Sequence, residues 1–123
     1  MSRFGVEVVR EPGYAVLRTN GYINNLGAER IEQEYDSLIE QGCRHFIINF
    51  AESPIINSMG LAILLGIIEK NLSTQGTIVF CCLTEVNAET MEIMDITQYV
   101  TLAPTEEAAR TFIEQQRLPI SAR

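Results

Sequence analysis

The stretch Ile55-Ile56-Asn57-Ser58-Met59-Gly60-Leu61 lies at a junction between two apolar segments of the chain. The preceding segment, 45–50, is predicted to be a strand buried on both faces. The following segment, about 58–72, is predicted to be a helix because of its length, its polar end and the serine at its start. Either Asn57 or Ser58 can cap this helix. The stretch therefore predicts a strand–loop–helix junction with a serine hydroxyl at the positive end of a helix.

Strands and helices alternate on both sides of this junction. Pro12-Gly13 predicts a turn, so the first two strands form a hairpin. The next helix, which Asn24 or Asn25 can cap, is expected to have a buried apolar face, while its acidic run Glu29–Asp36 faces solvent. Predicted strands cover 6–10, 14–19, 45–50, 77–83 and 98–102, and predicted helices cover about 25–41, 58–72, 84–95 and 104–117.

This order predicts an α/β fold with a mixed, mostly parallel sheet of about five strands and about four helices. We expect a single domain over 1–123, with its core at about 4–117 and a flexible tail at 118–123. Met91 and Met94 are expected to fill gaps in the core. The carboxyl ends of parallel strands carry function in such folds, which directs attention to the loop 51–57.

Composition restricts the possible partners and compartments. The net charge of −7 disfavours binding to nucleic acids and to anionic membranes. The apolar run 59–68 is too short to cross a bilayer, and the N-terminus lacks the apolar core of a signal peptide. The three cysteines, Cys43, Cys81 and Cys82, have no metal-binding or disulfide spacing and are expected to be buried, reduced thiols. We therefore expect a cytoplasmic protein that does not insert into membranes.

No catalytic motif accompanies Ser58. His45 is the single histidine, and an extended strand places it roughly 15 Å or more from the loop 51–57. The chain has no phosphate-binding GK[ST] loop, no GxSxG motif and no cluster of metal ligands. The side chains of Asn24 and Asn57 are neutral and suit turns and helix caps. The sequence thus predicts no catalytic residue, no metal, no cofactor and no enzymatic activity.

The element order and the motif Ile56–Leu61 together resemble the STAS domain, and more narrowly the bacterial anti-sigma-factor antagonists. The family pattern in this loop is Asp-Ser-Ser-Gly-Leu, so that Ser58, Gly60 and Leu61 fall on its phosphorylated serine, glycine and leucine. Upstream, Gly21–Asn24 falls on the family's Gly-Glu-Leu/Ile-Asp. The resemblance covers about residues 4–113. Asn57, Met59 and Asn24 depart from the pattern, which has aspartate, serine and aspartate there.

The resemblance implies a partner-switching regulator. Unphosphorylated, the domain would bind a kinase-type anti-sigma factor of the GHKL fold through Asn24, Asn57, Ser58 and Met59 and so release a sigma factor. The anti-sigma factor would then phosphorylate Ser58 with its own ATP, and a PP2C-type phosphatase would reverse the reaction. A phosphate adds about −1.5 to −2 charges, which would weaken the contact with the partner.

Two alternatives remain open at this point. The departures at Asn57 and Met59 favour a STAS adaptor that is never phosphorylated, such as a subunit of a lipid-transport ABC system or a stressosome-like scaffold. A small enzyme is the second alternative, and the absence of a nucleophile–base pair argues against it.

Overall fold

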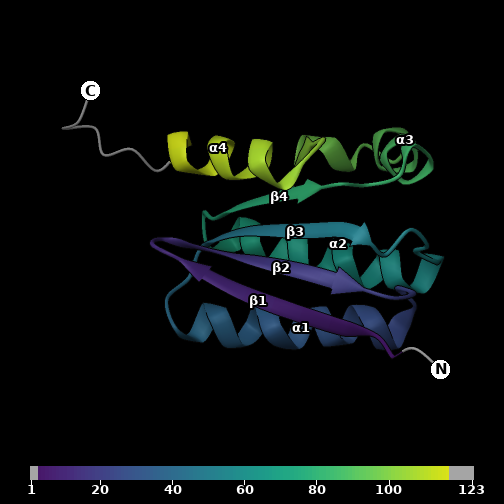
Figure 1. Ribbon diagram of the computed structural model, residues 1–123, viewed down its shortest axis with the longest axis horizontal. Coiled ribbons are helices and arrows are strands. Elements are labelled where there is room, and N and C mark those ends of the chain that lie inside the picture. The colour runs from purple at the N-terminus through teal and green to yellow at the C-terminus, as the bar shows by residue number, and fades with distance from the viewer. Residues whose placement is uncertain (1–2, 117–123) are drawn as a thin grey trace.

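One five-stranded sheet organises the chain, and helices cover both of its faces (Figure 1). The computed structural model describes residues 3–116. The strands are β1 (Gly5–Glu11), β2 (Tyr14–Asn20), β3 (His45–Glu52), β4 (Thr77–Cys81) and β5 (Thr101–Ala103). The helices are α1 (Asn25–Glu40), α2 (Ser58–Ser73), α3 (Glu85–Ile93) and α4 (Glu106–Gln116), with a short 3-10 helix, η1 (Ile96–Gln98), between α3 and β5.

The strands lie in the sheet in the order in which they occur in the chain. β1 pairs with β2 antiparallel across the Pro12-Gly13 turn, where Gly13 has a positive φ of 86° that favours glycine. All later pairs, β2 with β3, β3 with β4 and β4 with β5, are parallel. The predicted mixed, mostly parallel α/β sheet is therefore confirmed.

Alternate side chains of the strands point to two separate cores. On one face Leu17, Phe46 and Phe80 belong to the larger core, which α1 and α2 cover. On the other face Ile47 and Val79 pack against Ala109 and Ile113 of α4. Since both faces are covered, the central strands are apolar at nearly every position, which is the pattern that predicts them from sequence.

α1 and α2 lie side by side beneath the sheet and are joined by polar contacts. The buried Tyr35 hydroxyl donates to Asn71 Oδ1 at 2.8 Å. At the surface Lys70 forms ion pairs with Glu32 (2.9 Å) and Asp36 (2.7 Å). The acidic run of α1 is thus exposed or half-buried, as predicted, and part of its charge is paired with α2.

Several predicted boundaries differ from the structure. β3 continues to Glu52, which pairs with Asn20, so the loop that follows it is shorter than predicted. β4 ends at Cys81 because Cys82 adopts a left-handed conformation with φ of 64°. The fifth strand was predicted over 98–102 but begins at Thr101, since η1 occupies the residues before it. The predicted tail 118–123 lies outside the described residues.

Candidate functional site

Two loops meet at the carboxyl end of the parallel strands, the loop between β2 and α1 and the loop between β3 and α2. Ile23 N–H donates to the Ile55 carbonyl (3.0 Å), and Asn57 N–H donates to the Ile23 carbonyl (3.0 Å). Ile23 and Ile56 form an isolated parallel bridge, and the Ile23 side chain is buried. This pairing continues the sheet beyond its strands and brings Asn24 close to the Asn57–Met59 segment, so the residues predicted to bind a partner lie at the same end of the sheet.

Asn24 and Asn57 cap the two helices that leave these loops. Asn24 Oδ1 accepts from Gly27 N–H at 2.9 Å, and Asn57 Oδ1 accepts from Gly60 N–H at 2.8 Å. Each bond satisfies one of the free N–H groups of a first helical turn. The Asn57 amide also donates to the Tyr22 hydroxyl at 2.9 Å, which ties the second cap to the first loop. The choice between Asn57 and Ser58 as cap is thereby settled in favour of Asn57.

Gly60 is required by the close contact between α2 and the first loop. A Cβ at this position would lie 2.3 Å from the Ile23 carbonyl oxygen, far inside van der Waals contact. The same carbonyl accepts the hydrogen bond from Asn57 and cannot move without breaking the junction. The glycine of the motif therefore permits the approach of α2 to the loop rather than contacting a ligand.

Ser58 is the first residue of α2 and is exposed. Within residues 3–116 its hydroxyl forms no hydrogen bond, so the oxygen is available to a second molecule. It lies at the positive end of a helix whose first turn has no acidic residue. Ser53, the other serine of this loop, is buried, with its hydroxyl 2.8 Å from that of Thr19. Of the two, Ser58 is the accessible one.

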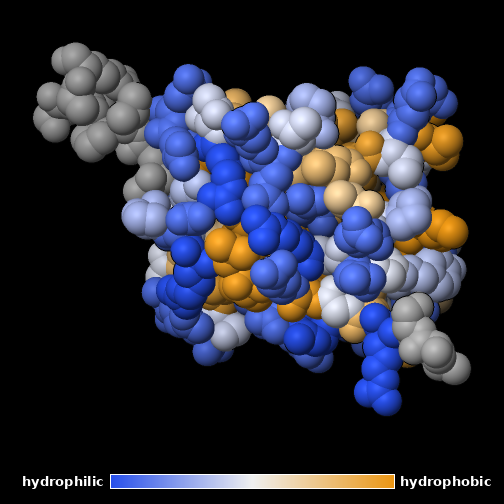
Figure 2. All heavy atoms as spheres, in the orientation of Figure 1, coloured by the Kyte–Doolittle hydropathy of each residue, from blue (hydrophilic) through white to orange (hydrophobic). Residues whose placement is uncertain are grey.

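Apolar side chains surround Ser58 at the molecular surface. Met59 is 59% exposed and Ile55 is 61% exposed, while Tyr22 and Leu26 project from the neighbouring loop and helix start. Figure 2 shows hydrophobic side chains gathered at the end of the molecule where α3 and the start of α2 lie. Exposed apolar groups concentrated in one area are typical of protein-binding surfaces. This surface extends the partner site predicted at Asn24, Asn57, Ser58 and Met59.

Two hollows flank this surface. The first lies beside the β2–α1 loop, where two arginines, Arg3 and Arg30, border Phe4, Tyr22 and Leu26. The second, which we call the α2–α3 groove, has a volume of about 380 Å³ and includes Ile56, Ser58, Leu61, Leu65, Thr90 and Met94. Met94 is 48% exposed, so the prediction that it fills the core is wrong, whereas Met91 is buried as predicted.

His45 lies at the start of β3, and Ser58 follows the end of the same strand. The structure therefore keeps these residues apart, as expected from the length of the strand. Among the described residues no three His, Cys, Asp or Glu side chains are arranged to hold a metal ion. Nor does any helix in the described part of the chain have the length and apolar character needed to cross a membrane.

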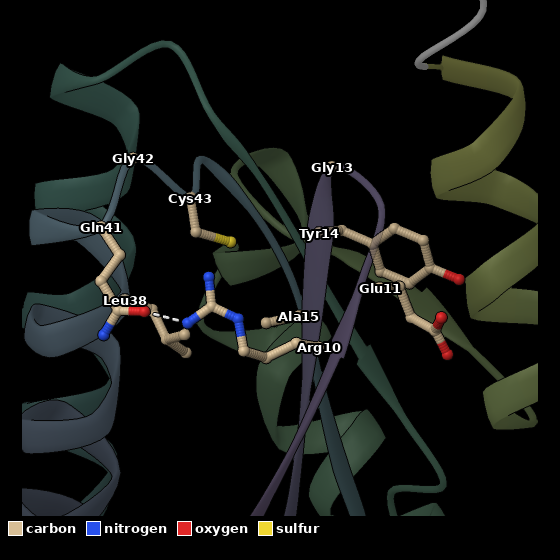
Figure 3. A pocket seen from close by; sticks show the side chains of 9 residues that line it. All are labelled: Arg10, Glu11, Gly13, Tyr14, Ala15, Leu38, Gln41, Gly42 and Cys43. Atoms are coloured by element: carbon tan, nitrogen blue, oxygen red, sulfur yellow. Dashed lines mark hydrogen bonds between the residues drawn. The ribbon is translucent and has the colours of Figure 1, made fainter.

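A small polar pocket opens at the opposite end of the sheet (Figure 3). Its volume is about 180 Å³, and the Arg10 side chain crosses it to hydrogen-bond Gln41 at the end of α1. The Cys43 thiol points into this pocket, and burial raises the pKa of that thiol and so disfavours a reactive thiolate. All three cysteines are unpaired; Cys81 is buried as predicted, while Cys43 and Cys82 are half-buried. The pocket offers structural contacts rather than a second reactive site.

One cluster of charges, centred on Glu106 in the first turn of α4, was not predicted from the sequence. The Glu106 carboxylate accepts from Arg18 (2.8 and 2.9 Å), Asn49 (2.9 Å) and Arg110 (3.0 Å). These bonds, chiefly those from Arg18, lower the pKa of Glu106 to about 2. Arg110 also binds Glu11, so that the cluster fastens α4 to β1, β2 and β3. Because the partners are distant in the chain, sequence spacing gives no signal for it.

Comparison with known proteins assigns the fold to a family. The model of the STAS domain matches residues 5–109, and the chain belongs to the STAS domain family. BtrV of Bordetella bronchiseptica, assigned as an anti-sigma factor antagonist, is 25% identical over 104 residues, which are 81% of this chain and 87% of BtrV.

Solved structures of anti-sigma factor antagonists share this fold. Unphosphorylated SpoIIAA is 22% identical with a TM-score of 0.70, covering 91% of this chain and 98% of its own. The phosphorylated form of SpoIIAA, a Bacillus cell fate determinant, has a TM-score of 0.68 at 21% identity, covering 89% and 99%. An anti-sigma factor antagonist from Mycobacterium paratuberculosis has a TM-score of 0.79 at 20% identity, covering 91% and 95%.

Proposed function

We propose that this protein is an anti-sigma-factor antagonist that switches partners by phosphorylation of Ser58. The observation that carries the proposal is the position of the Ser58 hydroxyl, exposed and without a hydrogen bond in the described residues, at the start of α2 among exposed apolar side chains. The names of its relatives support the general role. The partner would be a GHKL-fold anti-sigma factor kinase, acting with this chain in the cytoplasm.

In the phosphorylation step, Ser58 Oγ attacks the γ-phosphorus of the ATP held by the kinase. A new O–P bond forms, the bond from phosphorus to the β–γ bridging oxygen breaks, and ADP leaves. The hydroxyl proton passes to a base on the kinase. A PP2C-type phosphatase would reverse the modification by directing water onto the phosphorus, which restores the serine hydroxyl and releases phosphate.

The phosphate acts on binding through desolvation and charge. The side chains closest to Ser58 in the two loops are neutral, because asparagines occupy positions 24 and 57. Bound to a partner, a phosphoserine would have to lose water, and neither Asn24 nor Asn57 supplies a cation to pair with it. A loss of about 3 kcal/mol weakens binding by roughly a hundredfold, which is sufficient for exchange of partners.

The test combines phosphorylation with binding. The purified chain is incubated with the GHKL anti-sigma kinase of its source organism and ATP, and the phosphorylated residue is identified by mass spectrometry. We expect phosphate on Ser58, none on the Ser58→Ala variant, and a Ser58→Asp variant that binds the kinase at least about tenfold more weakly than wild type. Equal binding of Ser58→Asp and wild type would exclude the switch.

A constitutive STAS adaptor is the second candidate. It is favoured by Asn57, which stands where the resemblance predicts a carboxylate and which caps α2 through its amide oxygen and binds Tyr22 through its amide nitrogen. An adaptor would bind its partner, a transporter ATPase or a scaffold protein, without any phosphorylation. Stable co-purification with such a partner that is insensitive to Ser58→Asp would favour the adaptor.

A further inference from the structure

The α2–α3 groove is an apolar recess whose lining includes the proposed phosphorylation site. Its floor and one wall come from Leu61 and Leu65 of α2, and Thr90 and Met94 form the other wall. Apolar side chains in water at such a recess favour binding of another apolar surface. Ser58 lines the same groove, so a partner bound there lies close to the proposed phosphorylation site.

α3 extends the apolar surface beyond the groove. Val86 and Ile93 are seven residues apart, so they lie on the same side of the helix. They are 73% and 75% exposed, which is unusual for large aliphatic side chains on a helix that buries Met91 on its inner side. Thr90 and Met94 line the groove, and Val86 lines the adjoining hollow together with Thr90. The exposed Ile93 lies on the same side of α3 as Val86.

The charge on α3 defines the chemistry of a partner. Glu85, Glu89 and Glu92 are all exposed and form the edge of α3 beside Val86 and Ile93. The sequence has no lysine, arginine or histidine at 46–69 or at 71–109, so neither wall of the groove has a cation of its own. The groove is therefore an apolar strip with an acidic edge, and the one cation of α2, Lys70, is paired with Glu32 and Asp36 of α1.

We propose that the α2–α3 groove binds an amphipathic helix of the anti-sigma partner. Its apolar side chains would enter the groove between Leu61 and Met94, and lysines or arginines on its flank would face the carboxylates of α3. This inference rests on the proposed function and adds to it the part of the surface that selects the partner. It also explains why a phosphate on Ser58 disrupts binding, since that phosphate would meet apolar side chains of the helix rather than its basic flank.

The apolar part of the proposal is tested by a matched pair of truncations. Met94 and Leu72 are each 48% exposed, but Leu72 lies at the far end of α2, away from the groove. We expect Met94→Ala to weaken binding of the purified GHKL anti-sigma kinase about tenfold, and Leu72→Ala to leave the affinity unchanged, as measured by calorimetry. Equal effects of the two variants would overturn the proposal.

The electrostatic part is tested by charge reversal on α3. We expect Glu89→Lys to slow association with the kinase about tenfold at low salt, with a smaller effect as salt rises, because steering by complementary charges is screened. Glu40→Lys, an exposed reversal at the end of α1, makes the same change in net charge and should leave association nearly unchanged. If the two reversals slow association equally, net charge is responsible and the groove is not the site.

The outcomes separate this inference from the proposed function. If Ser58→Asp weakens binding while Met94→Ala and Glu89→Lys do not, the switch stands and the groove proposal fails. If the groove variants weaken binding while Ser58→Asp does not, the groove binds the partner and the switch fails. Sedimentation velocity tests whether a second copy of this chain occupies the groove instead. A dimer that Met94→Ala dissociates would overturn the proposal.

Discussion

Asn57 and Ser58 have different tasks although they are adjacent. Asn57 caps α2 and is bonded to Tyr22, whereas the Ser58 hydroxyl forms no bond within the described chain. We expect Asn57→Ala to lower the free energy of unfolding by about 1 kcal/mol, and Ser58→Ala to change it by less than about 0.5 kcal/mol. Urea denaturation of both variants measures the difference. If Ser58→Ala were the more destabilising change, Ser58 would be the cap and its hydroxyl would be less available for phosphorylation.

Gly60 and Gly66 both lie in α2, but only Gly60 lacks space for a side chain. A Cβ on Gly60 would lie 2.3 Å from the Ile23 carbonyl oxygen, whereas a Cβ on Gly66 would meet nothing within 4 Å. Gly60→Ala should therefore cost about 1–3 kcal/mol of stability and disturb the Ile23–Ile56 bridge. Gly66→Ala should stabilise the protein by about 0.5–1 kcal/mol through the helix preference of alanine. Thermal unfolding compares the two, and equal shifts in midpoint would show that the contact with Ile23 is not tight.

At the scale of elements, the attachment of α4 to the sheet depends on the charge of Glu106. Its pKa, about 2, is lower than the ordinary value near 4.5 because Arg18, Asn49 and Arg110 all donate to its carboxylate. A carboxyl whose pKa is lowered in the folded state stabilises the protein fully above its unfolded pKa and loses that contribution as the pH falls toward the folded pKa. The stabilisation by Glu106 should thus be complete above pH 4.5 and disappear between about pH 4.5 and 2.

The Glu106→Gln variant isolates this effect from other carboxyl groups. We expect it to lower the free energy of unfolding by about 2 kcal/mol at neutral pH, and the difference from wild type to shrink as the pH falls toward 2. Urea denaturation across this pH range measures the difference. Glu107→Gln is the control, since Glu107 is the exposed neighbour and takes no part in the cluster. A gap between Glu106→Gln and wild type that did not depend on pH would contradict this account.

Element order was predictable from the sequence, whereas some element ends were not. Hydrophobic periodicity and the turn at Pro12-Gly13 predict the hairpin and the alternation of strands and helices that the structure shows. The end of β4 was missed because it depends on the left-handed conformation of Cys82, a residue type that gives no such signal. The start of β5 was missed because η1 is stabilised by burial of Ile96, a tertiary contact.

For the whole molecule, the sequence indicated which end of the sheet carries the candidate site but not how far its exposed apolar surface extends. The parallel order of the strands was sufficient to place the loops of Asn24 and Ser58 at one end of the sheet. The exposure of Met94 was missed because an apolar residue three positions after Met91 fits the helical pattern of a core residue, whereas in the structure Met94 follows the end of α3 at the surface and lines the α2–α3 groove. A surface formed by two helices joined through a strand cannot be inferred from local spacing.

Phosphorylation of Ser58 should change the surface of this molecule without changing its fold. The hydroxyl is exposed and forms no bond in the described chain that the phosphate would break, and the positive end of α2 favours the added negative charge by about 0.3–1 kcal/mol. We therefore expect the midpoint of thermal unfolding to be unchanged or raised by roughly 2–5 °C. In amide NMR spectra of the phosphorylated and unphosphorylated chain, shifts should be confined to about 21–27, 55–62 and 90–94. A fall in the midpoint, or shifts that extend to β1 and α4, would mean that the switch acts through a change of shape. In that case the exposed charge alone could not account for the loss of the partner.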